Sequence, residues 1–164
     1  MTVLRRTGVA AAAVAALALL VPALPAWAHE AGHGNAPQTL VKAPLAGSLN
    51  SDPKLFGVAP GALPWVIESG TASVRADGRL SVKVDGLVVP TPPHNGTNPI
   101  PRLSASLVCN GTVVATTATV PFSASGRAEI SADVSVPTRC LAPAVLLNPN
   151  GNPGLFIAAT GSAG

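Results

Sequence analysis

Short turn signals between alternating apolar and polar residues constrain the fold of this chain more than any other feature. In residues 71–89, TASVRADGRLSVKVDGLVV, apolar side chains recur at every second position on both sides of Asp77-Gly78. A period of two is that of a β-strand with one buried face, and an Asp-Gly pair between two such runs is a strong hairpin signal. This stretch therefore predicts a β-hairpin with its valines and Leu80 facing the core.

Three later stretches repeat the arrangement. Residues 102–120 alternate around Asn110-Gly111, where a two-residue turn would pair Leu107 with Val114. Residues 122–136 turn at a Ser-Gly pair and then alternate, and the apolar runs AVLL and LFIAA flank the turn-rich NPNGNPG. No long stretch after residue 28 shows helical periodicity. These patterns predict about eight strands, each with one apolar and one small polar face.

Strands of this kind bury their apolar faces when two sheets pack against each other. We therefore predict an all-β fold, a two-sheet antiparallel β-sandwich that is immunoglobulin-like in the loose sense; a small β-barrel is the alternative. A true immunoglobulin domain has its tryptophan between its two cysteines, whereas Trp65 precedes both, so we expect a different topology. Trp65 lies among apolar neighbours in PWVI, which favours a place in the core, although it would also suit the wall of a small pocket.

The first 28 residues are organised as a helical secretory signal peptide. Arg5 and Arg6 precede an apolar, alanine-rich run, and Ala26-Trp27-Ala28 supplies the small residues that signal peptidase requires. The run is too short for an ordinary membrane anchor, which needs about 20 apolar residues. Cleavage after Ala28 makes His29 the first residue of the mature protein. The segment predicts export by the general secretion route, to the outside of the cell or the cell envelope, with no membrane span after cleavage.

The rest of the chain divides into a flexible leader, residues 29–44, and one β domain, residues 45–164. The domain is long enough for a single hydrophobic core. The chain has ten Lys and Arg residues and seven Asp and Glu residues, so removal of Arg5 and Arg6 with the signal leaves a net charge of +1. A nucleic-acid-binding protein needs a basic patch, and the composition argues against that class.

Cys109 and Cys140 are the two cysteines of the chain. Export brings them into an oxidising compartment, and an even cysteine count in a secreted chain favours a disulfide. The strand alternation places Cys109 on an inward face, where it can meet another strand. Their spacing does not resemble a CxxC redox motif, so we predict a structural disulfide between them.

The segment Val88–Arg102 is rich in proline and lies between two apolar strands. Prolines cannot donate ladder hydrogen bonds, which indicates a polyproline-like connection between the sheets. A rigid connection is the simpler interpretation. Loops on a rigid β scaffold also carry recognition, and the candidate binding residues of this one are Pro92, Pro93, His94 and Asn95.

His29 suggests copper chemistry. A free α-amine and an imidazole on one residue form a two-nitrogen chelate, and a third nitrogen from His33 or His94 would complete a T-shaped copper site. Copper carriers and copper-dependent polysaccharide oxygenases share the N-terminal histidine and the β-sandwich. However, we expect no strand after HEAGHGNAPQ that would fix the terminus, and a loose leader after a good cleavage site explains the same residues.

Catalytic patterns are absent from the sequence. The chain has no GxSxG motif, and nothing forces two carboxylates to converge as glycoside hydrolysis requires. The acidic residues of the β domain are scattered, at Asp52, Glu68, Asp77, Asp85, Glu129 and Asp133. We therefore predict that the protein is not an enzyme.

The segments GVAPGALPWVIESG, ADGRLSVKVDGL and CLAPAVLLNPNG, in this order, resemble small secreted proteins of actinomycete-type bacteria. The resemblance extends over about residues 45–160. It implies export, an all-β domain and the cysteine pair, and it carries no known activity, ligand or catalytic residue. The sequence thus predicts a secreted, non-catalytic binding or structural module without a cofactor, whose partner is an extracellular protein or envelope component. The alternative is a copper-binding protein that uses His29.

Overall fold

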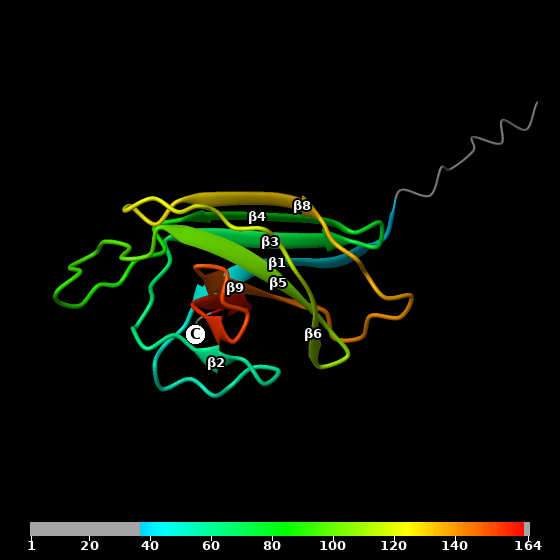
Figure 1. The fold of residues 1–164 in the computed structure, drawn as a ribbon, viewed down its shortest axis with the longest axis horizontal. Coiled ribbons are helices and arrows are strands. Elements are labelled where there is room, and N and C mark those ends of the chain that lie inside the picture. Colours follow the sequence, from blue (N-terminus) through cyan, green and yellow to red (C-terminus); the bar gives the residue numbers. More distant parts are fainter. Residues whose placement is uncertain (1–36, 163–164) are drawn as a thin grey trace, which may run out of the picture. The chain divides into compact units, whose positions relative to one another are not determined.

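A computed structural model describes residues 37–162, and all regular structure in this part of the chain is β (Figure 1). The predicted signal peptide and its predicted cleavage site lie outside these residues. No helix among the described residues has the length and apolar character needed to cross a membrane. The strands are β1 (Thr39–Gly47), β2 (Ala59–Pro60), β3 (Ser69–Arg75), β4 (Arg79–Asp85), β5 (Arg102–Cys109), β6 (Thr112–Thr116), β7 (Val120–Pro121), β8 (Ala128–Asp133), β9 (Ala144–Pro149), β10 (Leu155–Phe156) and β11 (Ala158–Thr160).

Nine of these strands form one curled antiparallel sheet. Its order is β6-β5-β9-β11-β1-β3-β4-β8, with β7 beside β5, while β2 and β10 form a separate parallel pair. Strand β1 links the two halves, because Thr39–Pro44 pairs with β3 whereas Leu45–Gly47 pairs with β11. The all-β prediction is confirmed. Two separate sheets are not, since both halves share β1 in one continuous hydrogen-bonded ladder.

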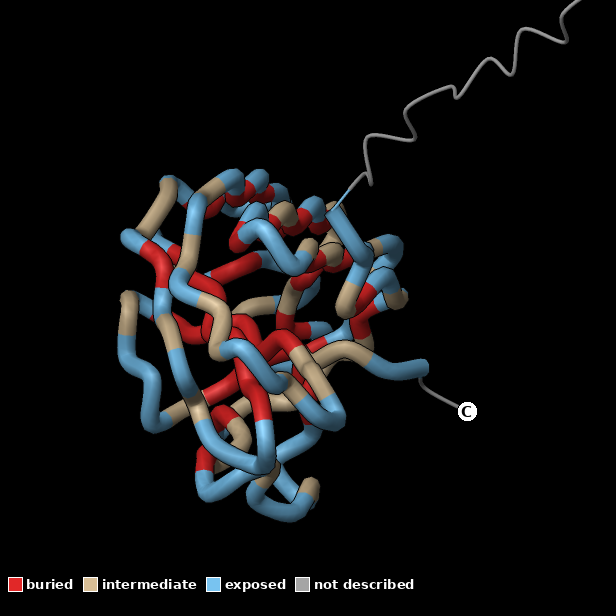
Figure 2. The backbone as a smooth tube through the Cα atoms, turned by 90° about the vertical axis from the view of Figure 1, so that its right-hand side faces the viewer, coloured by how far each residue is buried: buried red, intermediate tan, exposed pale blue. Residues whose placement is uncertain are grey.

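The curl brings the inner faces of the two halves together around one core. In Figure 1, β8, β4, β3 and β1 lie side by side across the top, and β5 and β9 pass below them. Buried and exposed residues alternate along the upper strands in Figure 2, as expected for strands with one apolar face. The core draws on both halves, and its fully buried members include Val74, Leu80, Val82, Leu103, Leu107, Ile130, Val145 and Leu147.

Three of the four predicted hairpins form, one of them with an error of register. At Ser125-Gly126 the chain turns as predicted, but the strands on either side do not pair with each other, because β7 pairs with β5 and β8 pairs with β4. Strands β3 and β4 pair across the Asp77-Gly78 turn, and β9 pairs with β11 across NPNGNPG. In the β5–β6 hairpin Cys109 lies opposite Thr112, but Leu107 pairs with Ala115 and not with Val114. A register shift between Leu107 and Val108 is the cause. An extra residue in one strand displaces every later pair, and alternation alone does not reveal it.

The N-terminal boundary of the domain lies earlier than the sequence indicated. Strand β1 begins at Thr39, within the predicted leader of residues 29–44. Val41 is buried and belongs to the core, and the strand runs antiparallel to β3 from its first residue. Residues 39–44 therefore belong to the domain. The alternation of this segment is hard to recognise in the sequence, because Leu40 and Val41 are adjacent apolar residues and Pro44 is an unusual strand residue.

A second, smaller layer covers the outer face of β5 and β9. Val58, which directly precedes β2, and Phe156 of β10 pack with Val108 and Leu146 in a separate apolar cluster. Polar groups on the same face are bonded to one another: the Ser106 hydroxyl donates to Asn148 Oδ1 at 2.7 Å, and Asn148 Nδ2 donates to the Leu155 carbonyl at 2.7 Å. Strand β5 is therefore buried on both faces, and both its leucines and its serines are core residues.

Candidate functional site

The loop between β4 and β5 carries the binding residues predicted from the sequence. It connects the two halves of the curled sheet and projects past the strand ends (Figure 1). Its base is held by Asn98, whose buried side chain donates to the Ile100 carbonyl at 2.7 Å and the Ser123 carbonyl at 2.9 Å. The Asn98 backbone N–H also donates to the Ala124 carbonyl at 2.8 Å. The loop is thereby fixed to the turn that precedes β8.

The tip of the loop is a hydrogen-bonded turn. The N–H groups of His94 and Asn95 donate to the Thr91 carbonyl at 3.0 and 3.1 Å. Thr97 then donates to the His94 carbonyl through its N–H, at 3.0 Å, and its hydroxyl, at 2.6 Å. The predicted polyproline-like connection is therefore wrong at the tip. Its backbone folds back on itself because Asn95 and Gly96 take positive φ values of 47° and 87°.

The four predicted loop residues lie together on this tip. Pro92, Pro93 and Asn95 are exposed, and His94 is half-buried. Asn95 Nδ2 donates to the Pro93 carbonyl at 3.3 Å, a local contact that leaves its carbonyl oxygen available. The structure assigns the His94 imidazole no hydrogen bond or ion pair within residues 37–162. The tip thus presents polar groups and proline rings on an ordered backbone.

The copper hypothesis concerns residues that lie mostly outside the described part of the chain. His29 and His33 lie outside residues 37–162, whereas His94 is on the loop tip. Within residues 37–162, no three His, Cys, Asp or Glu side chains gather as metal ligands would. Strand β1 begins at Thr39, directly after HEAGHGNAPQ, so the expectation that no strand follows this segment is wrong. Copper binding at His29 stays a prediction.

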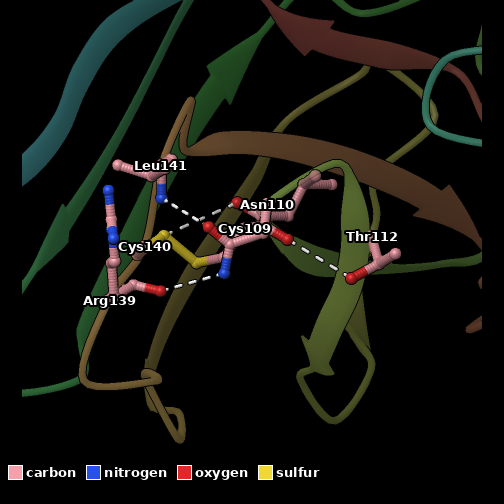
Figure 3. Close-up of a disulfide and its surroundings, with 7 residues drawn as sticks. Cys109, Asn110, Thr112, Arg139, Cys140 and Leu141 are labelled. Atoms are coloured by element: carbon pink, nitrogen blue, oxygen red, sulfur yellow. Dashed lines mark hydrogen bonds between the residues drawn. A yellow bond between two sulfur atoms is a disulfide. The ribbon is translucent and has the colours of Figure 1, made fainter.

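The predicted disulfide joins Cys109 and Cys140, 31 residues apart in sequence (Figure 3). Asn110 reinforces it, because its Nδ2 donates to the Arg139 carbonyl at 2.9 Å and its Oδ1 accepts from the Leu141 N–H at 2.9 Å. The two bonds hold the residues on both sides of Cys140. This side chain therefore ties the β5–β6 turn to the long connection between β8 and β9.

A hollow of about 760 Å³ opens beside the loop base, where β3, β4 and β8 meet Pro101 and Phe122. Two ion pairs line it: Lys83 Nζ lies 3.0 Å from Glu129 Oε1, and Arg127 Nη2 lies 2.8 Å from Asp85 Oδ2.

The hydrogen bond and charge of Asp85 raise the pKa of Arg127. Exposed pairs of this kind add little to stability. The hollow offers paired charges, and both carboxylates already face a cation.

Trp65 belongs to the core, with 2% of its surface exposed. It also contributes to the wall of a smaller hollow of about 300 Å³, next to Gly61 and Ile157. The two interpretations open at the sequence level are therefore compatible: the ring packs inside, and part of it reaches a surface depression.

Sequence reasoning missed Asn98, the residue that orders the loop. The available signal was the Asn98-Pro99 dipeptide, a common turn initiator.

No protein family, curated protein or solved structure matches this chain.

Proposed function

We propose that this protein is a secreted, non-catalytic binding module, and that the β4–β5 loop tip, Thr91–Thr97, contacts its partner. The partner is an extracellular protein or a component of the cell envelope. The observation that carries the proposal is the loop itself: an exposed tip whose backbone is ordered by its own hydrogen bonds and anchored by the buried Asn98 side chain. An ordered loop loses little conformational entropy on binding, so its exposed groups can contribute to affinity.

We also propose that the protein is exported and that its fold acts as a two-layer sandwich. Residues 1–28 would act as a helical signal peptide on the general secretion route, and the two halves of the curled sheet would serve as the layers of a loosely immunoglobulin-like sandwich. The Cys109–Cys140 disulfide supports export because such bonds persist in oxidising compartments. Intact mass of the protein recovered outside the cells tests the route: a chain that begins at His29 supports it, and an uncleaved chain retained inside the cells contradicts it.

The loop is tested by a double substitution, Thr91→Ala with His94→Ala. Neither side chain makes a hydrogen bond recorded within the described residues, so the fold should survive. Thr138→Ala, at an exposed position in the β8–β9 connection, is the matched control. Immobilised protein is exposed to fractionated envelope and culture-medium components. We expect a component that the wild-type and control proteins retain and the loop variant loses. Equal retention by all three would assign binding to another surface.

A further inference from the structure

Strand β8 forms one end of the sheet. It pairs with β4 through six consecutive residue pairs, from Arg79 opposite Asp133 to Val84 opposite Ala128, and no strand of residues 37–162 pairs with its other side. In Figure 1 it lies at the upper edge of the ribbon, above β4. An unpaired strand edge presents a row of free backbone donors and acceptors, and is a template for a further strand.

The hydrogen bonds at both ends of β8 show which backbone groups are free. The Val134 N–H donates to the Gly78 carbonyl, and the Gly126 carbonyl accepts from the Leu87 N–H. Even-numbered residues therefore point their backbone groups toward β4, whereas the Arg127 carbonyl points the other way and accepts from Ser123. By this alternation the N–H and C=O groups of Glu129, Ser131 and Asp133 point outward. No backbone partner for them occurs within residues 37–162.

The opposite end of the sheet, β6, is less suited to strand addition. Its pairing with β5 contains a register shift, and a bulge twists an edge away from regular pairing. The β4–β8 ladder has no such irregularity. The free groups of β8 span five residues, which is close to the usual length of a strand.

The side chains of β8 indicate which charge a partner strand should carry. Glu129, Ser131 and Asp133 are exposed on the outer face, while Ala128 and Ile130 face the core. Strand β4 shows what complements this pattern, because Lys83 lies opposite Glu129, with 3.0 Å between the charged atoms, and Arg79 lies opposite Asp133. A strand added on the free side would lie beside the same three side chains, those of Glu129, Ser131 and Asp133.

A second copy of β8 that pairs around Ser131 does not supply the opposite charges that Glu129 and Asp133 favour. Antiparallel pairing of two β8 strands around Ser131 would place Glu129 of one copy opposite Asp133 of the other, and like charges directly opposite destabilise a strand pair. In this register the acidic side chains disfavour self-pairing, whereas a strand of opposite charge would meet no such repulsion.

We propose that the free edge of β8 binds an extended segment of a partner protein in which basic residues alternate with small apolar ones. The segment would continue the sheet by backbone hydrogen bonds to residues 129–133, and its basic side chains would lie beside Glu129 and Asp133. This surface is separate from the loop tip.

The test measures binding of a labelled, end-blocked peptide, RLSVKV, to the protein that begins at residue 29. The peptide copies the alternation of basic and apolar residues in residues 79–84. The comparison peptide ELSVEV keeps the apolar positions and reverses the charges. Fluorescence anisotropy should show binding of the basic peptide at least tenfold tighter than that of the acidic one. No binding of the basic peptide at millimolar concentration, or equal affinity for the two, would overturn the proposal.

Two variants locate the binding. Ser131→Pro removes an outward N–H that has no partner in the sheet, and proline is tolerated on the free side of an edge strand. We expect it to weaken the basic peptide at least tenfold, whereas Ser131→Ala keeps wild-type affinity. If the proline variant unfolds, Glu129→Lys with Asp133→Lys decides instead, because it should reverse the preference to the acidic peptide. An unchanged preference, or self-association of the wild-type protein that Ser131→Pro abolishes, would contradict the proposed occupant.

Discussion

At the scale of single residues, the same dipeptide serves different purposes. Asn-Gly occurs at residues 95, 110 and 150, and each asparagine and glycine takes a positive φ, as a tight turn of this type requires. The Asn110 side chain makes contacts distant in sequence, to the residues on either side of Cys140. Asn95 makes one local contact. The turn explains the dipeptide, and the tertiary contact distinguishes one copy from another.

We therefore predict that Asn110→Gly destabilises the protein more than Asn95→Gly does. Both substitutions keep a residue that tolerates positive φ, but the first also removes two hydrogen bonds. The free energy of unfolding should fall by about 1–2 kcal/mol for Asn110→Gly and by less than about 0.5 kcal/mol for Asn95→Gly. Urea denaturation with the disulfide intact measures both. Equal losses would show that the Asn110 side chain contributes nothing beyond its turn.

The copper hypothesis also belongs to the residue scale. It predicts that protein with a verified N-terminal His29 binds one Cu²⁺, with a nitrogen-rich electron paramagnetic resonance signal, because its amine and imidazole chelate the ion together. An extra alanine before His29 should abolish the binding, since it moves the amine to another residue. Binding that survives the added alanine, or binding no tighter than that of an ordinary peptide, would contradict the hypothesis.

At the scale of elements, the ends of strands are fixed by close backbone approaches. Gly78 has a φ of 93°, and a Cβ atom there would collide with the carbonyl of Val134, which follows β8. Gly96 has a similar φ of 87°, but a Cβ atom there would meet nothing within 4 Å. The β3–β4 turn therefore supports β8 as well as its own hairpin.

Gly78→Ala is accordingly expected to cost more than Gly96→Ala. The latter carries only the strain of alanine at positive φ, about 1 kcal/mol. The former adds the displacement of the Val134 backbone, for a total of roughly 3 kcal/mol. Thermal and urea unfolding of the two variants give the comparison. If Gly78→Ala lowers the free energy of unfolding no more than Gly96→Ala does, the backbone at Val134 can shift at little energetic cost.

At the scale of the whole molecule, β1 holds the two halves of the sheet together. Its segment Thr39–Pro44 pairs with β3, with a register shift at Leu40, and its last three residues pair with β11. Val41 and Leu45 contribute to the shared core. Without the first part of β1, one half of the sheet would lose its connection to the other and β3 would gain a free edge.

A chain that begins at residue 37 should therefore fold, and one that begins at residue 45 should not. We expect a cooperative thermal transition from the first and none from the second, followed by far-ultraviolet circular dichroism. The longer chain controls for loss of the N-terminal residues as such. A cooperative transition of the shorter chain at the same temperature would return residues 39–44 to the leader.

The sequence by itself determined what depends on neighbours along the chain. Alternation around Asp77-Gly78 and Asn110-Gly111 was enough to predict the hairpins and the inward face of Cys109, because turn geometry and a period of two are local properties. The cysteine count was enough for the disulfide. The tertiary structure decided what depends on strand order: the single curled sheet joined by β1, the register shift beside Leu107, the Asn98 anchor and the free edge of β8. These arise from contacts between segments far apart in sequence, and each segment's own pattern is compatible with several such partners.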